Sequence, residues 1–260
     1  MTENLFERFV EFGRFIDFAR RTLFALPGCL IRRPLSVLAQ FERVAWGSLP
    51  VILAAGFSVG VVTWLQSRRS LVSSGFQDQL PSVLAMAVLV ETGPLLASVL
   101  VASRMGAGLA AEMGSMELTE QIDAQIVLGS PPIRSLVAPR VVACVLALPL
   151  LTVLLDATAV LGGMLTEQVA GSLTPQAYGI KSLEYLFNRD IVPATLKTAL
   201  FGFLVGTISC WTGMRSGRST EDVGRAATRG VVRSTLAVFF FNVLIVPVIQ
   251  AGVDVLGWHD

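Results

Sequence analysis

Charged residues are scarce in this chain. Only 15% of its 260 residues are Asp, Glu, Lys or Arg, whereas 53% are hydrophobic. Soluble domains usually carry about 25% charged residues. The formal net charge is +1, and without a surplus of Lys and Arg a phosphate-binding nucleic-acid surface is not expected. The composition therefore predicts a polytopic helical membrane protein.

Residues and motifs that carry catalysis are also missing. The single histidine, His259, is the penultimate residue and is interpreted as a solvated tail residue, which removes histidine triads and zinc sites. Cys29, Cys144 and Cys210 lie far apart and are interpreted as small packing residues. No glycine-rich loop ends in Lys-Ser or Lys-Thr. We expect no enzyme activity, bound metal or cofactor in this chain, and a membrane-embedded enzyme is the least favoured class.

The first 48 residues predict helices in the membrane interface. Residues 5–26 place apolar side chains every three or four positions and charged side chains on the other side. That segment is too charged to span a bilayer, although a soluble helix packed on a partner is the alternative. The Pro27–Gly28 pair is expected to end it, and a second short helix is expected from Pro34 to Trp46.

Five apolar runs follow, and a helix needs about 20 such residues to cross the bilayer. We place the spans at 49–66, 82–101, 141–165, 191–213 and 231–256. No internal repeat is visible, so residues 1–260 are interpreted as one domain. The predicted fold class is an all-α polytopic membrane protein with an N-terminal amphipathic interfacial helix, five transmembrane helices and one short polar helix.

The basic residues predict the orientation, because Lys and Arg are retained on the cytoplasmic side. With the N-terminus inside, 15 of the 20 Lys and Arg residues fall in inside segments. The C-terminus is then outside, the polar helix at 116–128 faces the cytoplasm, and the loop at 166–190 faces outward. The first 21 residues lack the apolar core of a cleavable signal peptide, so we expect the first span to direct targeting.

Two carboxylates, Glu91 and Asp156, fall inside predicted spans. A charge at the bilayer centre is costly and usually faces a bundle interior or a cavity. One interpretation is the polar wall of a substrate path or a proton-coupled site. The other is a structural carboxylate bonded to neighbouring helices.

Small residues recur at a spacing of four, which lets two helix backbones approach closely. The contact is expected either within one subunit or between two subunits. The residues concerned are Gly56, Gly60, Ala102, Gly106, Ala110 and Gly114.

The segment 116–128 predicts a helix of about 20 Å at 1.5 Å per residue. Its acidic residues gather in the N-terminal half, where the helix dipole favours them. Ile122, Ile126 and Val127 supply an apolar side. We interpret it as a docking helix held at both ends by membrane spans, with a solvated connector as the alternative.

Taken together, five segments resemble the MlaE/YrbE permease family, the membrane subunits of Mce-associated ABC lipid transporters. The order and spacing of the segments carry the resemblance over about 50 residues. The segments are Glu91-Thr92-Gly93-Pro94, Ala102-Ser103-Arg104-Met105-Gly106-Ala107, Ala110-Ala111-Glu112-Met113-Gly114-Ser115-Met116, Thr119-Glu120-Gln121-Ile122-Asp123-Ala124 and Pro139-Arg140.

The resemblance implies a bacterial inner-membrane permease that acts as a homodimer or as paired paralogues. An ABC ATPase subunit would bind each copy on the cytoplasmic face and use ATP, and an Mce-domain protein would sit on the outer face. The segment 116–128 would be the coupling helix. Its expected ATPase contacts are Glu117, Thr119, Glu120, Gln121 and Asp123.

The cargo implied by the resemblance is a phospholipid or similar hydrophobic molecule, held in a cavity for which Glu91, Leu95 and Asp156 are candidates. The family often has a basic residue before the matched glutamate, where this chain has Val90. We therefore expect Glu91 to be protonated or paired differently. The alternatives are a proton- or ion-coupled carrier that uses Glu91 and Asp156, and a structural anchor for an outer complex.

Overall fold

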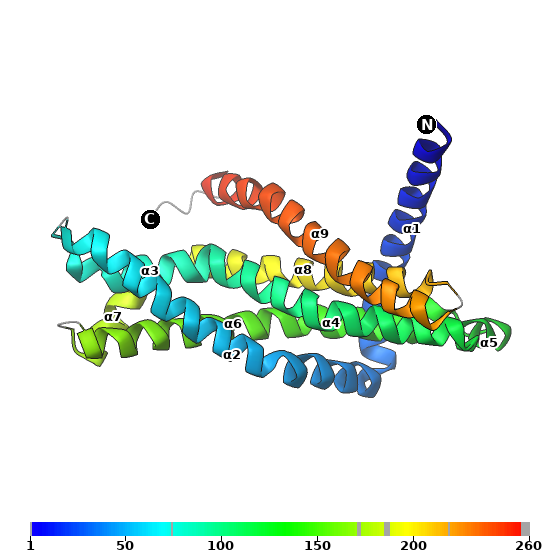
Figure 1. Cartoon of the computed structure of the whole chain (residues 1–260), viewed down its shortest axis with the longest axis horizontal. Helices are drawn as coiled ribbons and strands as arrows, with labels where there is room; N and C mark the ends of the chain where they lie inside the picture. The colour runs from blue at the N-terminus through cyan, green and yellow to red at the C-terminus, as the bar shows by residue number, and fades with distance from the viewer. Residues whose placement is uncertain (1, 74, 171–172, 185–187, 218, 256–260) are drawn as a thin grey trace. The chain divides into compact units, whose positions relative to one another are not determined.

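The computed structural model describes residues 2–73, 75–170, 173–184, 188–217 and 219–255. Within these residues the chain is helical, and the fold is that of an all-α polytopic membrane protein (Figure 1). Five helical segments are long and apolar enough to cross a membrane, which confirms the predicted fold class. They are Pro34–Ser73, Leu80–Leu118, Ile133–Ala170, Ile191–Met214 and Thr220–Ile249. His259 and the last residue of the predicted fifth span, Leu256, lie outside the described residues.

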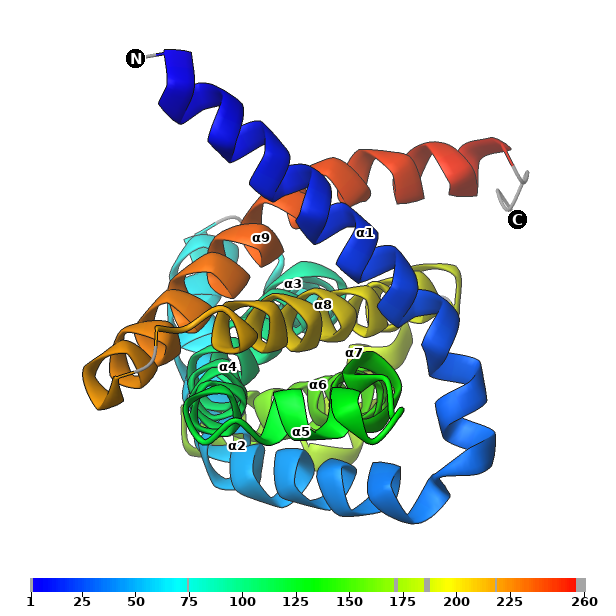
Figure 2. The same ribbon diagram turned by 90° about the vertical axis from the view of Figure 1, so that its right-hand side faces the viewer.

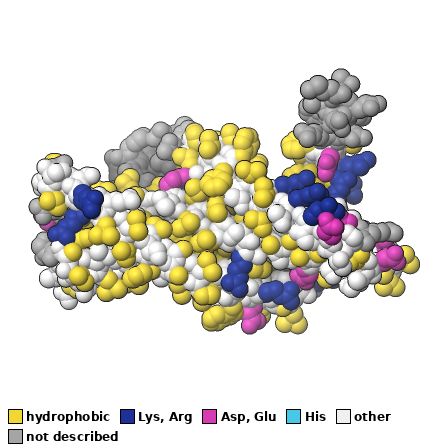
Figure 3. All heavy atoms as spheres, viewed as in Figure 1, with side chains coloured by type: hydrophobic (Ala, Val, Ile, Leu, Met, Phe, Trp, Pro, Cys, Tyr) yellow, Lys and Arg dark blue, Asp and Glu magenta, His cyan; other side chains and the backbone are white. Residues whose placement is uncertain are grey.

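Large apolar side chains are exposed along these helices, as the yellow surface in Figure 3 shows. Leu35 on the second helix is 80% exposed and Val243 on the last is 71% exposed. Water would penalise such a surface, whereas lipid acyl chains solvate it without cost. The exposed apolar surface is therefore the lipid-facing surface of a membrane protein.

The first helix, α1, runs from Thr2 to Arg32 and does not end at Pro27–Gly28 as predicted. A proline inside a helix removes one backbone hydrogen bond, but packing can offset that loss. Beyond the proline, Cys29 is buried in a cluster with Val37, Ala138 and Val142. The helix instead ends before Pro34, which disfavours helical geometry in the residue preceding it.

The expected boundary between a short helix ending at Trp46 and a span starting at Leu49 is absent. A single helix, α2, covers Pro34–Ser73 and contains Pro50 (Figure 1). A break next to the bilayer would leave backbone N–H and C=O groups without partners, whereas a continuous helix satisfies them internally. The proline at the first helical position starts α2 as predicted.

The predicted helix at 116–128 is divided in two. Met116–Leu118 are the end of α4, Gly93–Leu118, and a separate helix α5 covers Gln121–Val127. Glu120 joins them in the left-handed conformation with φ 56°. The sequence prediction failed here because no glycine or asparagine marks the turn. After α5, Gly129 adopts a left-handed conformation with φ 73°, and helices often end at a glycine in this conformation.

The remaining elements fit the predicted spans with extensions. The second span combines α3 (Leu80–Ala87), the π-helical turn η2 (Val88–Thr92) and α4, after the short helix η1 (Gln77–Gln79). The third combines the π-helical turn η3 (Ile133–Val137) and α6 (Ala138–Ala170). The loop at 166–190, which was predicted to face outward, contains the unpredicted helix α7 (Pro175–Glu184), and α8 (Asn188–Met214) follows. The last helix, α9 (Thr220–Val255), begins before the predicted start of the fifth span at residue 231.

The described chain divides into two compact units, to each of which α2, α4, α6, α8 and α9 contribute a part. Unit 1 comprises residues 1–44, 101–146 and 202–237, and unit 2 comprises 45–100, 147–201 and 238–260. The core of unit 1 contains Phe18, Met113, Ile122, Val137, Val141 and Cys210. The core of unit 2 contains Trp64, Leu80, Leu84, Val88, Ala159 and Tyr178.

A polar cluster lies within the core of unit 2. The Trp64 indole donates a 2.7 Å hydrogen bond to Glu167, so this buried carboxylate has a donor. Burial raises the pKa of the nearby Tyr178 phenol, and the Glu167 carboxylate raises it further. Tyr178 therefore stays neutral at physiological pH. The cluster joins α2 and α6 in the unit that also contains Glu91.

Candidate functional site

The first candidate site is the π-helical turn η2, Val88–Thr92, which carries Glu91 between α3 and α4. A π-helical turn inserts one residue into an otherwise regular helix and frequently marks a functional site. The inserted residue shifts the register, so the side chains before and after η2 point in different directions than a continuous α-helix would give them. The turn thus sets the direction of Glu91.

Glu91 is paired with Lys197 of α8. The Lys197 ammonium lies 2.7 Å from Glu91 Oε2 and also donates to the Val90 carbonyl at 3.2 Å. Asn242 of α9 donates a short hydrogen bond to the other carboxylate oxygen. The Lys197 side chain is 3% exposed and that of Glu91 is 42% exposed. Three helical segments therefore meet at one carboxylate.

Because Val90, the residue before Glu91, is not basic, the sequence did not show which residue pairs with Glu91. The basic partner of Glu91 is Lys197, which follows it by 106 positions. Sequence inspection placed Lys197 and Asn242 in the fourth and fifth spans but did not assign them to the site. A cation and an amide are rare within apolar runs, and in a membrane such residues usually have polar partners. That rarity was the sequence signal that could have assigned them to the site.

Asp156 lies against the same turn from α6. Its carboxylate occupies the space that a Cβ atom on Gly93, the residue after η2, would need. Within the described part of the chain, Asp156 Oδ1 is buried and has no hydrogen-bond partner. The two predicted carboxylates thus flank one π-helical turn, whereas Leu95 lies half-buried early in α4.

The second candidate site is α5, shown in Figure 2 turned across the end of α4. Buried Ile122 anchors it in the unit 1 core, and Ser135 donates a 2.6 Å hydrogen bond to Gln125. The predicted contacts Thr119, Glu120, Gln121 and Asp123 are exposed, and Glu117 is half-buried.

The C-terminal end of α5 is apolar and open. Val127 is 87% exposed and Leu128 is 82% exposed. Two adjacent aliphatic side chains beside exposed carboxylates give this end of α5 a mixed apolar and acidic surface. The sequence predicted an apolar side made of Ile122, Ile126 and Val127. Ile126 and Val127 are exposed, whereas Ile122 faces the core.

A charge network holds the C-terminal part of α4 in unit 1. Arg140 of α6 is nearly buried and donates a 2.7 Å hydrogen bond to Glu112. Arg43 of α2 approaches the same carboxylate at 3.3 Å, but its side chain is 59% exposed. Glu112 therefore links α4 to α6 through a shielded bond and to α2 through a weaker one. Glu112 and Arg140 both belong to segments that carry the family resemblance, but the sequence did not predict that they pair.

The small residues pack within the chain. A Cβ on Gly56 or Gly60 would overlap the α6 backbone at Leu155 or Ala159 in unit 2. In unit 1, a Cβ on Gly106 would lie 3.2 Å from a serine of α8 and 3.3 Å from a serine of α9. Ala102 and Ala110 are fully buried, and Gly114 faces Ser216 and the C-terminal end of α8. Both series thus serve close helix packing inside one copy.

Among the described residues, no three His, Cys, Asp or Glu side chains lie close enough to hold a metal ion. Ionisable residues inside membrane-spanning helices usually face the bundle interior or a cavity and pair with one another. The described sites are therefore those of a multi-pass membrane protein with a charged pair inside its helical fold.

The chain belongs to the MlaE permease family, because the family described as Permease MlaE matches residues 37–248. It is 34% identical over 242 residues to the probable ABC transporter permease protein of Rickettsia felis, covering 92% of this chain and 93% of that protein. It is 29% identical over 243 residues to the intermembrane phospholipid transport system permease protein MlaE of Haemophilus influenzae, with 90% and 93% covered.

A plant relative extends the comparison. The protein TRIGALACTOSYLDIACYLGLYCEROL 1, chloroplastic, of Arabidopsis thaliana is 34% identical over 204 residues, covering 78% of this chain and 58% of that protein. The chain is accordingly a permease subunit of an ABC transporter.

Proposed function

We propose that this chain is the membrane subunit of an ATP-driven phospholipid transporter. Its relative in Haemophilus influenzae is named as part of an intermembrane phospholipid transport system. The chain would move lipid between the bacterial inner membrane and an outer Mce-domain partner, as a homodimer. The energy would come from a separate ATPase, because the sequence contains no phosphate-binding loop.

The observation that carries the coupling is the geometry of α5. Its core contact through Ile122 and its bond through Gln125 fix the helix to unit 1. Asp123 in α5, Glu120 just before it and the pair Val127–Leu128 stay exposed. A fixed helix with an open, mixed acidic and apolar face can transmit force from a docked protein. Movement of the ATPases would reach α4 through the short turn at Glu120.

The charged turn supplies the polar part of the lipid path. Glu91 and Lys197 neutralise each other, so the wall gains hydrogen-bonding capacity without net charge. Glu91 is 42% exposed, which leaves its carboxylate accessible to a lipid headgroup. Leu95 and Asp156 are further candidates for this cavity.

Glu120→Lys tests the docking role, with Glu42→Lys as the matched control. Both glutamates are exposed in unit 1, and both substitutions change the charge by the same amount. The tagged permease is purified from its native membrane, and the ratio of ATPase to permease is measured by quantitative mass spectrometry. Glu120→Lys should lower that ratio by at least about tenfold, and Glu42→Lys should leave it unchanged. A wild-type ratio for Glu120→Lys would show that α5 is not the ATPase site.

The proposed orientation puts the N-terminus and α5 in the cytoplasm and the C-terminus outside. The native cysteines Cys29, Cys144 and Cys210 are buried, so they give little background in a thiol-labelling assay. Gln121→Cys should react with a membrane-impermeant maleimide only in inverted vesicles, and Asp78→Cys only in intact cells. The opposite pattern would invert the topology.

A proton-coupled carrier remains the competing function, and the unpaired oxygen of Asp156 is the observation that favours it. Glu91 is engaged by Lys197 and Asn242, which leaves Asp156 as the less constrained carboxylate. Lipid transfer driven by a pH gradient without ATP would support the carrier. Transfer that needs ATP at equal pH on both sides would exclude it.

A further inference from the structure

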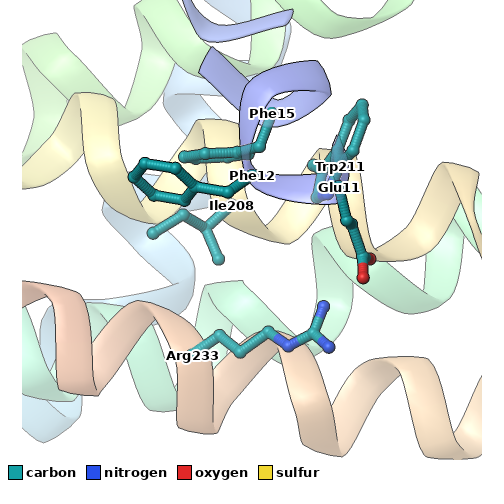
Figure 4. Close-up of a pocket in the computed structure, with 6 residues that line it drawn as sticks. All are labelled: Glu11, Phe12, Phe15, Ile208, Trp211 and Arg233. Carbon is teal, nitrogen blue, oxygen red and sulfur yellow. The ribbon is translucent and has the colours of Figure 1, made fainter. Parts of the chain in front are cut away.

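Two adjoining cavities in unit 1 form one amphipathic groove between α1, α8 and α9. The apolar part has a volume of about 390 Å³ and is lined mainly by Phe12, Phe15, Ile208 and Trp211 (Figure 4). The polar part has a volume of about 230 Å³ and shares Glu11, Trp211 and Arg233 with the apolar part. Ligand pockets typically have volumes of about 300–1,000 Å³, so the combined groove is large enough for part of an amphiphile.

The polar part has a surplus of cations. Arg215, Arg229 and Arg233 line it together with only two carboxylates, those of Glu11 and Asp222. Glu11 approaches Arg215 at 3.9 Å, the outer limit of an ion pair. Both side chains of that pair are more than one-third exposed, so the pair contributes little.

Asp222 is already engaged elsewhere. It lies 2.7 Å from Arg225 and accepts a 2.7 Å hydrogen bond from Ser219. Within the described side chains, Arg229 and Arg233 have no carboxylate partner. Two guanidinium groups therefore remain available to an anion, and arginine binds phosphate oxygens with two parallel hydrogen bonds.

A hydroxyl donor lies in the same polar part. Ser216 lines it, and its Oγ atom is buried without a hydrogen-bond partner among the described residues. Arg215 stacks on the Trp211 ring at 4.7 Å from its centroid, which holds one guanidinium at the boundary with the apolar part. Hydrogen-bond donors thus gather at one end of the groove.

The apolar end suits an acyl chain rather than a second polar group. Phe12 is 62% exposed although it lines the cavity. The Trp211 ring also packs edge-on against Phe15 at 5.9 Å between centroids. Aromatic side chains of this kind gather where hydrocarbon meets the headgroup layer.

We propose that this groove binds an anionic phospholipid, with its phosphate at Arg229 and Arg233 and its acyl chain against Phe12 and Trp211. The occupant follows from the pairing of a cationic end with an apolar end in a chain embedded in phospholipid. The bound lipid would tie the amphipathic helix α1 to α8 and α9. The site shares no residue with the Glu91 site and does not depend on the proposed transport function.

Bromolipid quenching of Trp211 fluorescence tests the site directly. The full-length chain is reconstituted in nanodiscs with a fixed fraction of brominated phosphatidylglycerol or of brominated phosphatidylcholine. The signal from Trp211 is the difference between each protein and its Trp211→Phe counterpart. We expect the anionic lipid to quench that signal with a preference of about tenfold over the zwitterionic lipid.

The double substitution Arg229→Ala/Arg233→Ala should remove the preference, and Arg229→Lys/Arg233→Lys should retain most of it. Arg32→Ala/Arg33→Ala is the matched control, because it removes the same charge from another pocket of unit 1. Circular dichroism confirms that each variant is folded.

Three results would overturn the proposal. The first is an unchanged preference in the double alanine variant. The second is an equal loss in the control, which would indicate general attraction to the surface. The third is loss of quenching on addition of excess inorganic phosphate, which would identify a free-phosphate site.

Discussion

The ion pair of Glu91 and Lys197 gives the sharpest test of the site. Glu91→Gln removes the negative charge but keeps an oxygen that can accept the Asn242 bond. The Lys197 ammonium, 3% exposed, then keeps only neutral acceptors, among them the Val90 carbonyl at 3.2 Å. Removing one partner of a buried pair costs about 3–5 kcal/mol. Because Glu91 is itself 42% exposed, we expect a loss near the lower limit, about 3 kcal/mol.

A double-mutant cycle separates that penalty from other effects. Lys197→Met removes the cation and keeps an apolar side chain of similar length. Glu91→Gln/Lys197→Met removes both members of the ion pair, and we expect its stability within about 1 kcal/mol of the wild type. The single Glu91→Gln variant should melt lower by about 6–12 °C, scaled from soluble domains of similar size. Thermal unfolding in detergent micelles, followed by circular dichroism, measures all four proteins.

The same variants distinguish packing from transport. If Glu91 and Lys197 line the lipid path, the double variant should regain stability while lipid transfer stays low. Strictly additive losses of stability in the cycle would refute the pairing. Full recovery of transfer by the double variant would show that the pair is only structural.

Two further predictions concern helix packing and the charge network at the C-terminal part of α4. Gly60→Ala should cost about 2–3 kcal/mol because the added methyl group overlaps the α6 backbone, whereas Gly108→Ala, with open space around it, should gain up to about 1 kcal/mol. Equal melting temperatures would contradict the α2–α6 contact. Glu112→Gln should cost about 3 kcal/mol because it leaves Arg140 nearly buried without a counter-charge. Arg43→Ala should cost less than about 1 kcal/mol because that side chain is largely exposed. A larger loss of stability for Arg43→Ala than for Glu112→Gln in the same melting assay would show that Arg43, and not Arg140, is the main partner of Glu112.

The helical class and the five spans could be predicted because an apolar run longer than the bilayer is thick has few alternatives. Helix ends were harder. Tertiary packing around Cys29 carries α1 past Pro27, a contact that depends on residues more than a hundred positions away. At Glu120 the chain adopts a left-handed conformation that glutamate does not signal.

The candidate site was predictable in part. Glu91 and Asp156 were identified because a carboxylate within an apolar run is rare. Their relation to one π-helical turn was not predictable, since no sequence pattern marks the extra residue. Lys197 and Asn242 were visible as polar residues, but pairing over 106 and 151 positions depends on how the helices pack.

ATP-dependent lipid transfer is the most direct test of the central claim. Proteoliposomes would contain this permease with the ATPase and the outer-face protein that copurify with it, and a fluorescent phospholipid would report transfer. We predict transfer that requires ATP hydrolysis, persists without a pH gradient and is lost with Glu120→Lys. Transfer at the same rate without ATP, or transfer driven by a pH gradient alone, would contradict the proposed function.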